Sequence, residues 1–568
     1  MANKSIEGEA YQLKDILATE LSAYYQIPAY QRPYQWGKEQ CEELLNDLFE
    51  NYEDHGEDDY FCGSLVFIQS DKDNKTDIVD GQQRLSTFIL LAKVLATLYS
   101  ERLDPMIQEY LQESWSDRHE DGEKKKRKRL DFDLVGSSAK KDFQYALTSF
   151  NDAPVSNNKN NYLKNAVCLK NYLRKKEIED INDFIEWLYF KVVFITITCS
   201  DTDMALRIFN VLNARGLPLH ATDIFKGELL KKLTEEKEQE ELATRWENLR
   251  QKCLDNGFAM ETLFSQHLTY LNPVTSKKRT KIRLNTQFDE LQKFPLEYLD
   301  VVEDFYNAYC EVLEMQDRHA HLLSYLASDF WHVILCTSIL HCYSESEIEA
   351  LKELLVKFYY QHWVAKKPKD QREQTCCNII KALKEKESID DIISIARENL
   401  NEYSVTQDFK KNLRDDHLYE KYKKSPKNSW LKPILILVEY FMSDDPKPKR
   451  IQTNDFHVEH ILPQKPDLSS QWTKDFSEEE RECYTHSLAN LTLLGGKKNA
   501  EASNLDFKDK KKIYMGEEIR LNKKRPFRAM TCYKMTIDIA HHYTEWTPKS
   551  LEKREKELIE IIESVLTL

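Results

Sequence analysis

An acidic residue and a histidine that could serve in hydrolysis are adjacent near the end of the chain. Glu459 and His460 belong to the segment FHVEHILPQ, which spans residues 456–464. A carboxylate is a preferred ligand of a hard divalent cation, and an imidazole with a pKa near neutrality can take a proton from an attacking water. Neighbouring side chains on a strand project to opposite faces, so we expect these two residues to have separate tasks.

Two asparagines follow in a pattern that fits the same site. Asn490 lies in the segment LANLTLLGGKKN (488–499), and Asn499 comes nine residues later, across a loop with two glycines. Amide oxygens also suit a hard cation. Residues 491–530 hold 11 Lys or Arg against 5 Asp or Glu, which favours contacts with phosphates. The residues that we expect to make such contacts are Asn504, Lys508, Lys511, Lys512 and Tyr514.

A second polar cluster lies near the N-terminus, in the segments IPAYQRPYQW (27–36) and VDGQQRLST (79–87). The pattern predicts a strand over 76–80, a turn at Gly81 and then a buried helix up to about residue 98. Backbone N–H groups at a helix N-terminus favour a phosphate. Arg84 could donate to that phosphate, and Asp80 could bind Mg²⁺ or position a water. The remaining candidates for this pocket are Gln31, Arg32, Gln82 and Gln83, with Tyr34 and Trp36 stacking on a base.

The composition is that of a helix-rich globular protein. The 568 residues are 41% hydrophobic and 31% charged, with only 13 Gly and 16 Pro, which excludes a disordered chain. The net charge of −15 excludes a polycation that coats nucleic acid, so any DNA contact must be local. The first 100 residues, with 8 Lys or Arg against 18 Asp or Glu, are strongly acidic. This asymmetry indicates different partners for the two ends.

Cysteine usage and hydropathy indicate a cytoplasmic location. The twelve cysteines are scattered without a CxxC pair, which favours reduced core thiols over disulfides or a zinc site. No run approaches the roughly 18–20 apolar residues of a membrane span, and the N-terminus lacks a secretory signal. Three domains are expected: residues 1–235 with the DGQQR motif, a helical middle at 236–443, and residues 444–568 with the EHILPQ motif. The segment 552–566 is expected to be an amphipathic docking helix.

The two motif groups together resemble the GmrSD-like, modification-dependent (type IV) restriction endonucleases, with SspE-like nicking nucleases among their relatives. The pattern IPxYQRxYxW followed by DGQQRLST resembles the ParB-like N-terminal domain of that family, and FNVLNARGLPL (209–219) with DIFK (223–226) resembles its third block. EHILPQ, NLTLL and the later asparagine resemble the HNH nucleases. The resemblance covers about 20–230 and 450–530.

This resemblance implies a helix-rich, multidomain α+β fold: a ParB-like α+β domain, a helical middle and a ββα-metal HNH finger. It implies catalytic roles for His460 as general base, for Asn490 as the brace of the loop, and for Asp80 and Arg84 in nucleotide hydrolysis. Glu459 and Asn499 would hold Mg²⁺ (or Mn²⁺). GTP or another NTP would bind the DGQQR turn together with residues of the third block. The nucleotide-binding set is Gln31, Arg32, Tyr34, Asp80, Gly81, Gln82, Gln83, Arg84, Asn213, Arg215 and Asp223.

The function that the resemblance implies is a phage-defence DNA endonuclease, regulated by a nucleotide and dependent on Mg²⁺. Its substrate would be modified double-stranded phage DNA, and a homodimer would suit the cutting of two strands. Two alternatives stay open. One is an NTP-hydrolysing DNA-binding regulator with an inert HNH finger, and the other is an effector whose NTPase depletes nucleotide or gates a partner. The complete set of Glu459, His460, Asn490 and Asn499 favours the endonuclease.

Overall fold

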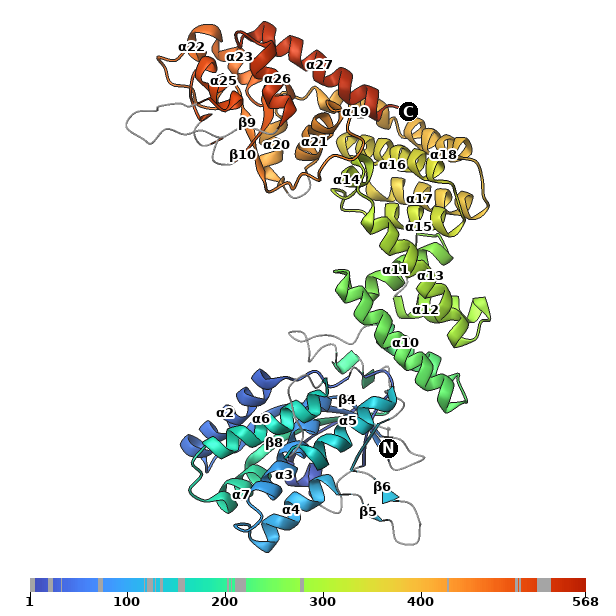
Figure 1. The fold of residues 1–568 in the computed structure, drawn as a ribbon, viewed down its shortest axis with the longest axis vertical. Coiled ribbons are helices and arrows are strands. Elements are labelled where there is room, and N and C mark those ends of the chain that lie inside the picture. Colours follow the sequence, from blue (N-terminus) through green and yellow to red (C-terminus); the bar gives the residue numbers. More distant parts are fainter. Residues whose placement is uncertain are drawn as a thin grey trace. The chain divides into compact units, whose positions relative to one another are not determined.

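A computed structural model describes most of the chain, and Figure 1 shows its fold. The described residues are 6–18, 24–31, 33–69, 75–116, 118–119, 126–127, 129–132, 136–151, 159–201, 204–205, 207–209, 221–275, 280–426, 429–495, 499, 502–517 and 533–568. The chain divides into two compact units. The first consists of residues 1–264 and 278–301, and the second consists of residues 265–277 and 302–568.

A mixed six-stranded sheet forms the centre of the first unit. The strand order is β1-β8-β3-β4-β2-β7. β1 pairs antiparallel with β8, β3 runs parallel to β8 and antiparallel to β4, and β2 runs parallel to both β4 and β7. Their bounds are β1 (Ile6–Gln12), β2 (Tyr24–Ile27), β3 (Tyr60–Gln69), β4 (Lys75–Asp80), β7 (Leu130–Phe132) and β8 (Val192–Cys199). A separate pair is formed by β5 (Arg118–His119) and β6 (Lys126–Arg127).

Both faces of the sheet pack against other parts of the chain. Side chains alternate along each strand, so neighbouring residues of one strand contribute to cores on opposite faces. Leu65 and Phe67 of β3 belong to the main core, which also contains the buried side chains of helices α2, α3, α6 and α7. Val66 and Val79 lie in a separate core on the other face, against which Ile224 packs. The helices of this unit are α1 (Leu13–Leu17), α2 (Lys38–His55), α3 (Gln82–Leu98), α4 (Pro105–Trp115), α5 (Gly136–Ser149), α6 (Asn161–Lys175), α7 (Ile181–Lys191), α9 (Ala221–Lys231), α10 (Glu236–Asp255) and α12 (Thr280–Leu291).

The second unit begins as a series of helices. The chain passes between the units within α11 (Met260–Leu271) and again within α13 (Pro295–Glu314). The helices that follow are α14 (Arg318–Leu323), α15 (Phe330–Leu340), α16 (Glu345–Ala365), α17 (Lys369–Lys384), α18 (Ile389–Glu402), α19 (Val405–Leu413), α20 (Leu418–Lys424) and α21 (Leu431–Phe441).

A short antiparallel strand pair follows in the same unit. β9 (Phe456–His460) pairs with β10 (Leu491–Gly495), and Glu459 lies opposite Thr492. Around this pair lie α22 (Trp472–Asp475), α23 (Glu478–Tyr484), the 3₁₀ turn η2 (Leu488–Asn490), α25 (Phe507–Met515), α26 (Lys534–His542) and α27 (Pro548–Leu566). α27 contacts both α16 and α21, and Gln361 of α16 donates to the carbonyl of Leu566 at 2.6 Å. The prediction of a docked terminal helix is therefore confirmed.

The expected fold class, a helix-rich multidomain α+β protein, is also confirmed. In the part of the chain that the structure describes, no helix has the length and apolar character needed to cross a bilayer.

Candidate functional site

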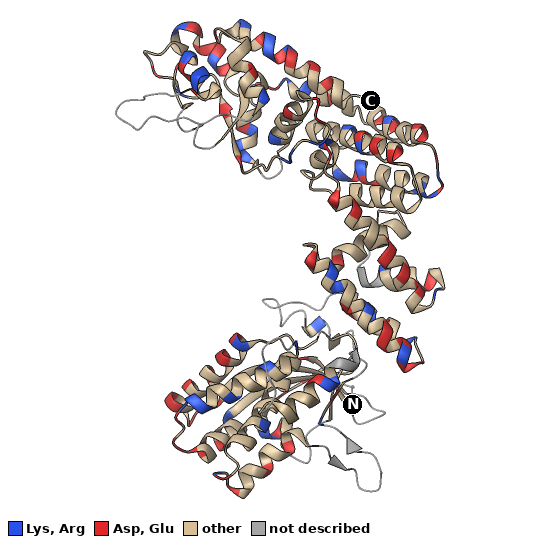
Figure 2. Cartoon of the chain, viewed as in Figure 1, with Lys and Arg blue, Asp and Glu red and all other residues tan. Residues whose placement is uncertain are grey.

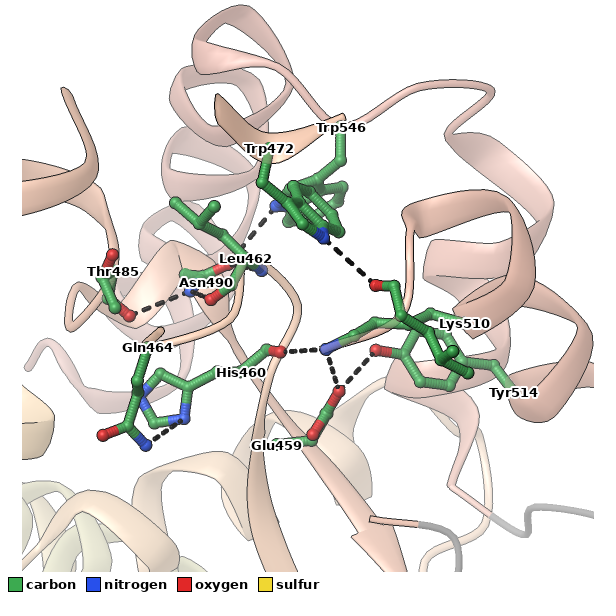
Figure 3. A network of polar contacts seen from close by, with 11 residues as sticks. Glu459, His460, Leu462, Gln464, Trp472, Thr485, Asn490, Lys510, Tyr514 and Trp546 are labelled. Carbon is green, nitrogen blue, oxygen red and sulfur yellow. Dashed lines mark hydrogen bonds and ion pairs between the residues drawn. The ribbon is translucent and has the colours of Figure 1, made fainter. Parts of the chain in front are cut away.

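Glu459 and His460 are the last two residues of β9, and both side chains are buried. The alternation of the strand sends them in different directions, as Figure 3 shows. Glu459 points toward α25, whereas the His460 ring contacts Tyr419 of α20. The strand therefore separates the carboxylate from the imidazole, as their adjacent positions in the sequence predict.

The Glu459 carboxylate has two partners on α25. Lys510 donates to its Oε1 at 2.7 Å and Tyr514 donates to the same atom at 3.1 Å. Lys510 also donates to the carbonyl of His460 at 2.6 Å, so it holds the end of β9 in two places. Burial raises the pKa of Glu459 and lowers the pKa of Lys510, while their mutual attraction opposes both shifts. This ion pair anchors β9 to α25.

The His460 imidazole lies between two other rings. Its centroid is 4.2 Å from that of Tyr419 and 5.5 Å from that of His486, and both contacts are edge to face. Nδ1 lies 3.3 Å from the side-chain amide nitrogen of Gln464, and Nε2 has no hydrogen-bond partner among the described residues. Burial is the main cause that lowers the pKa of His460 to about 3. The ring is therefore neutral near pH 7, but a pKa this low makes it a weaker base than the imidazole with a near-neutral pKa that is expected from the sequence.

Asn490 is fully buried, and both the oxygen and the nitrogen of its side-chain amide form hydrogen bonds. Its Oδ1 accepts from the Leu462 N–H at 2.7 Å and from Trp546 Nε1 at 3.3 Å, and its Nδ2 donates to the carbonyls of Leu462 and Thr485 at 2.9 Å each. These bonds hold the segment that follows His460 against the segment that precedes β10 (Figure 3). This geometry is that of a brace for the loop.

Arg554 of α27 supports the brace from behind. Its guanidinium is buried and donates to the carbonyls of Ala489 and Leu491, the second at 2.9 Å. These carbonyls flank Asn490 in the sequence. The terminal helix therefore fixes the backbone that positions the asparagine.

The Asn499 side chain carries a buried amide oxygen. Its carbonyl accepts from the N–H of Ser503 at 3.2 Å, as in a helical turn. Its Oδ1 is buried and has no hydrogen-bond partner among the described residues, a costly arrangement unless a ligand satisfies that atom. A carboxylate at Glu459 and an amide oxygen at Asn499 are the donor types that Mg²⁺ prefers.

The predicted phosphate contacts lie on and before α25, which carries several basic residues (Figure 2). Asn504 and Lys508 are exposed. Lys511 donates to the carbonyl of Tyr543 at 2.7 Å, and Lys512 pairs with Asp509 at 2.7 Å. Tyr514 differs from the prediction, because its side chain is fully buried against Glu459 and does not reach a surface phosphate.

Sequence reasoning did not single out Lys510 or Arg554. Both lie at helical spacing from buried apolar residues: Lys510 three residues after Phe507, and Arg554 three residues after Leu551. This periodicity places each cation on the buried face of its helix. This spacing is the feature of the sequence from which the burial of Lys510 and Arg554 could have been predicted.

The DGQQR motif forms the junction between β4 and α3. Gly81 has φ 95°, and a Cβ there would lie 2.1 Å from the side chain of Leu65, so the turn requires glycine. Asp80 accepts from the N–H of Gly81 at 2.8 Å and lies 3.8 Å from the Arg84 guanidinium. Arg84 Nη1 donates to the carbonyl of Cys62 at 3.1 Å.

Gly63 of β3 is a residue of this junction that sequence reasoning missed. Its φ is 115°, and a Cβ would lie 1.9 Å from Arg84 Nη1. The register of β3 against β8 shifts between Phe61 and Gly63. A glycine within a predicted strand is a known sign of such irregularity and of close approach, so the sequence did contain a signal.

The other residues predicted around the junction form contacts within the protein. Gln31 donates to the carbonyl of Val79 at 2.6 Å, and Gln83 accepts from the N–H groups of Gln35 and Trp36. Gln82 is buried, and Trp36 packs against the core.

Tyr34 differs from its predicted role. Its ring is buried and stacks on Tyr162 at 4.3 Å, and its hydroxyl lies 2.7 Å from the hydroxyl oxygen of Thr87. Burial raises its pKa above the ordinary value. Because it faces the core, the ring is not open to a base.

The third block is described only in part. Asp223 is buried on α9, whose Ile224 packs with the core that contains Tyr30 and Val79. α9 thus lies beside the β4–α3 junction. Arg32, Asn213 and Arg215 lie outside the described residues.

Comparison with known families identifies the chain at both ends. Residues 13–230 match the GmrSD restriction endonuclease, N-terminal domain, and residues 403–561 match the GmrSD restriction endonucleases, C-terminal domain. The chain therefore belongs to the GmrSD restriction endonuclease family, and the predicted resemblance is confirmed. Membership makes it a restriction endonuclease of phage defence, with DNA as its substrate. A comparison with curated proteins finds no match.

Proposed function

We propose that the end of β9 is the cleavage centre of an HNH-type, Mg²⁺-dependent DNA endonuclease that acts in the cytoplasm according to the modification of the DNA. The observation that carries this proposal is the buried His460 imidazole at the end of β9, whose Nε2 has no hydrogen-bond partner among the described residues. A neutral imidazole can act as general base toward a water that attacks the phosphodiester.

The surrounding residues support that role. Tyr419 and His486 fix the plane of the His460 ring by edge-to-face contacts, and Asn490 holds the loop that leaves β9. Glu459 and Asn499 would hold the Mg²⁺ ion, which would stabilise the charge that develops on the phosphate.

The test is plasmid cleavage in Mg²⁺ with unmodified, hydroxymethylated, glucosylated and phosphorothioated DNA. His460→Ala is compared with His457→Ala, because His457 is exposed on the same strand two residues earlier. We expect wild type and His457→Ala to cut at least one substrate and His460→Ala to be at least 100-fold slower. Equal cleavage rates for the two variants would contradict the role of His460 as general base. The inert-finger alternative would then explain defence.

We also propose that the β4–α3 junction binds GTP or another NTP and regulates cleavage. The N-terminus of α3 follows Gly81 and offers backbone N–H groups to a phosphate. Arg84 is the third residue of that helix and has a partly exposed guanidinium. Binding of a fluorescent GTP analogue should weaken at least tenfold in Arg84→Ala. Arg102→Ala, which changes an arginine beyond the other end of α3, is the matched control. If both variants bind equally well, the nucleotide does not occupy this junction.

A further inference from the structure

A cavity of about 740 Å³ lies in the helical part of the second unit. It is formed by the segment 325–328 between α14 and α15, the end of α16, the start of α17, α20 and the start of α21. Its volume is within the roughly 300–1,000 Å³ of small-ligand sites. Basic residues dominate its charge, and none of the described residues that line it is acidic. The basic residues are Lys366, Lys367, Lys369, Arg372 and Lys421.

Two of these five cations form no close ion pair with a carboxylate among the described residues. They are Arg372 and Lys366, which form no ion pair within 4 Å although the charge of Lys366 helps to lower the pKa of Asp415; the other three pair with acidic residues outside the cavity lining. The Arg372 guanidinium lies 5.0 Å from the centroid of the Tyr359 ring. Its Nε is buried and has no hydrogen-bond partner in the described part of the chain. The cavity therefore presents positive charge that an anion would satisfy.

Aromatic side chains line the same cavity beside the cations. Tyr325, Trp363, Tyr422 and Trp430 all contribute to its wall. His362 adds a buried imidazole whose Nε2 lies 2.8 Å from Asn399 Oδ1 and whose Nδ1 has no partner among the described residues. Aromatic rings stack on bases and cations bind the attached phosphates, so this mixture suits a nucleotide better than an inorganic anion.

We propose that this cavity binds a nucleotide unit, an aromatic base with its phosphate, supplied either by a DNA strand or by a free nucleoside phosphate. The base would lie among the aromatic residues, and the phosphate would contact Lys366 and Arg372. The site is separate from the DGQQR junction, which lies in the first unit.

Helix α20 joins this cavity to His460. Leu418, Lys421 and Tyr422 line the cavity, and their spacing places them on one face of the helix. The neighbouring Tyr419 contacts the His460 ring, and its N–H donates to the carbonyl of His486 at 3.2 Å. An occupant that moves α20 would therefore move the ring that packs on His460. This coupling rests on the function proposed for His460, whereas binding in the cavity does not.

The experiment is photo-crosslinking of the full chain followed by peptide mapping. One probe is 8-azido-GTP, and the other is an oligonucleotide that contains 4-thiothymidine, offered as single strand and as duplex. We expect labelled peptides from residues 359–372 or 418–431. Lys366→Gln/Arg372→Gln should reduce this labelling at least tenfold. Lys381→Gln/Arg397→Gln removes the same charge from exposed positions of α17 and α18, and should leave the labelling within twofold of wild type.

The two probes identify the source of the nucleotide. Labelling by the thiothymidine probe assigns the cavity to a DNA strand, and labelling by the azide probe assigns it to a free nucleotide. Labelling confined to other peptides, or an equal loss in both double variants, overturns the proposal. His460→Ala should label like wild type. If wild type cuts no DNA but labels these peptides, the proposed cleavage centre fails while the nucleotide site holds.

Discussion

Lys510 of α25 donates to Glu459 of β9 at 2.7 Å although the two residues are 51 positions apart, and both side chains are buried. The pair fixes α25 against the end of β9, where His460 is the last residue. Because both charges are removed from water, the loss of either partner leaves the other uncompensated. The same contact engages one oxygen of the carboxylate that we propose as a metal ligand.

Replacement of Lys510 by methionine should therefore destabilise the second unit by about 3–5 kcal/mol, the usual cost of a broken buried pair. Lys508→Met changes an exposed lysine on the same helix and should alter the free energy of unfolding by less than about 0.5 kcal/mol. Urea denaturation followed by circular dichroism measures both. Adding Glu459→Gln to Lys510→Met should recover at least half of the loss, and no recovery would mean that the cost arises from packing instead.

Asn490→Ala should lower the free energy of unfolding by about 2–4 kcal/mol, because the buried N–H and carbonyl partners of the amide would lose their bonds. Its partners include the backbone of Leu462 and Thr485. Asn504→Ala at an exposed position is the control for the same change in side chain. A similar stability of the two variants would show that the loop does not depend on this brace.

Gly63→Ala should destabilise the first unit by about 1–3 kcal/mol, since alanine is strained at positive φ and its Cβ would displace Arg84. Gly8→Ala on β1 is the matched control, because nothing lies within 4 Å of the added Cβ. Thermal unfolding compares the two. If the proposed nucleotide site is correct, Gly63→Ala should also weaken binding of the GTP analogue, and unchanged binding would separate Arg84 from that site.

Acid should destabilise the second unit through its buried histidines. Burial lowers the pKa of His267 to about 3 in the folded chain, against about 6.5 when unfolded. The unfolded state therefore binds more protons between these values, so stability is complete above pH 6.5 and decreases as the pH falls toward 3. At pH 5 the loss is about 2 kcal/mol for this residue.

His267→Phe removes this titration, while the ring can still pack against Phe305. The variant should lose about 2 kcal/mol less than wild type between pH 7.5 and pH 5, measured as the change in the urea unfolding free energy. His541→Phe, at an exposed position, should respond to pH like wild type. An identical pH response of His267→Phe and wild type would show that this histidine is not the source of the acid sensitivity.

Local patterns were enough to predict the elements that carry the motifs. The strand up to Asp80, the turn at Gly81 and the following helix are formed as expected, because alternation and glycine conformation are properties of neighbouring residues. The opposite directions of Glu459 and His460 follow from strand geometry in the same way. The family could also be recognised from these motifs alone.

Contacts between distant segments decided the rest. Tyr34 and Tyr514 were expected at a ligand, but tertiary packing buries both. Lys510 and Arg554 became parts of the site because α25 and α27 fold against the β9–β10 pair. The sequence by itself thus determined the motifs and the strands, turns and helices that carry them. Burial and partners were decided by the tertiary structure, because each depends on a helix that lies tens of residues away along the chain.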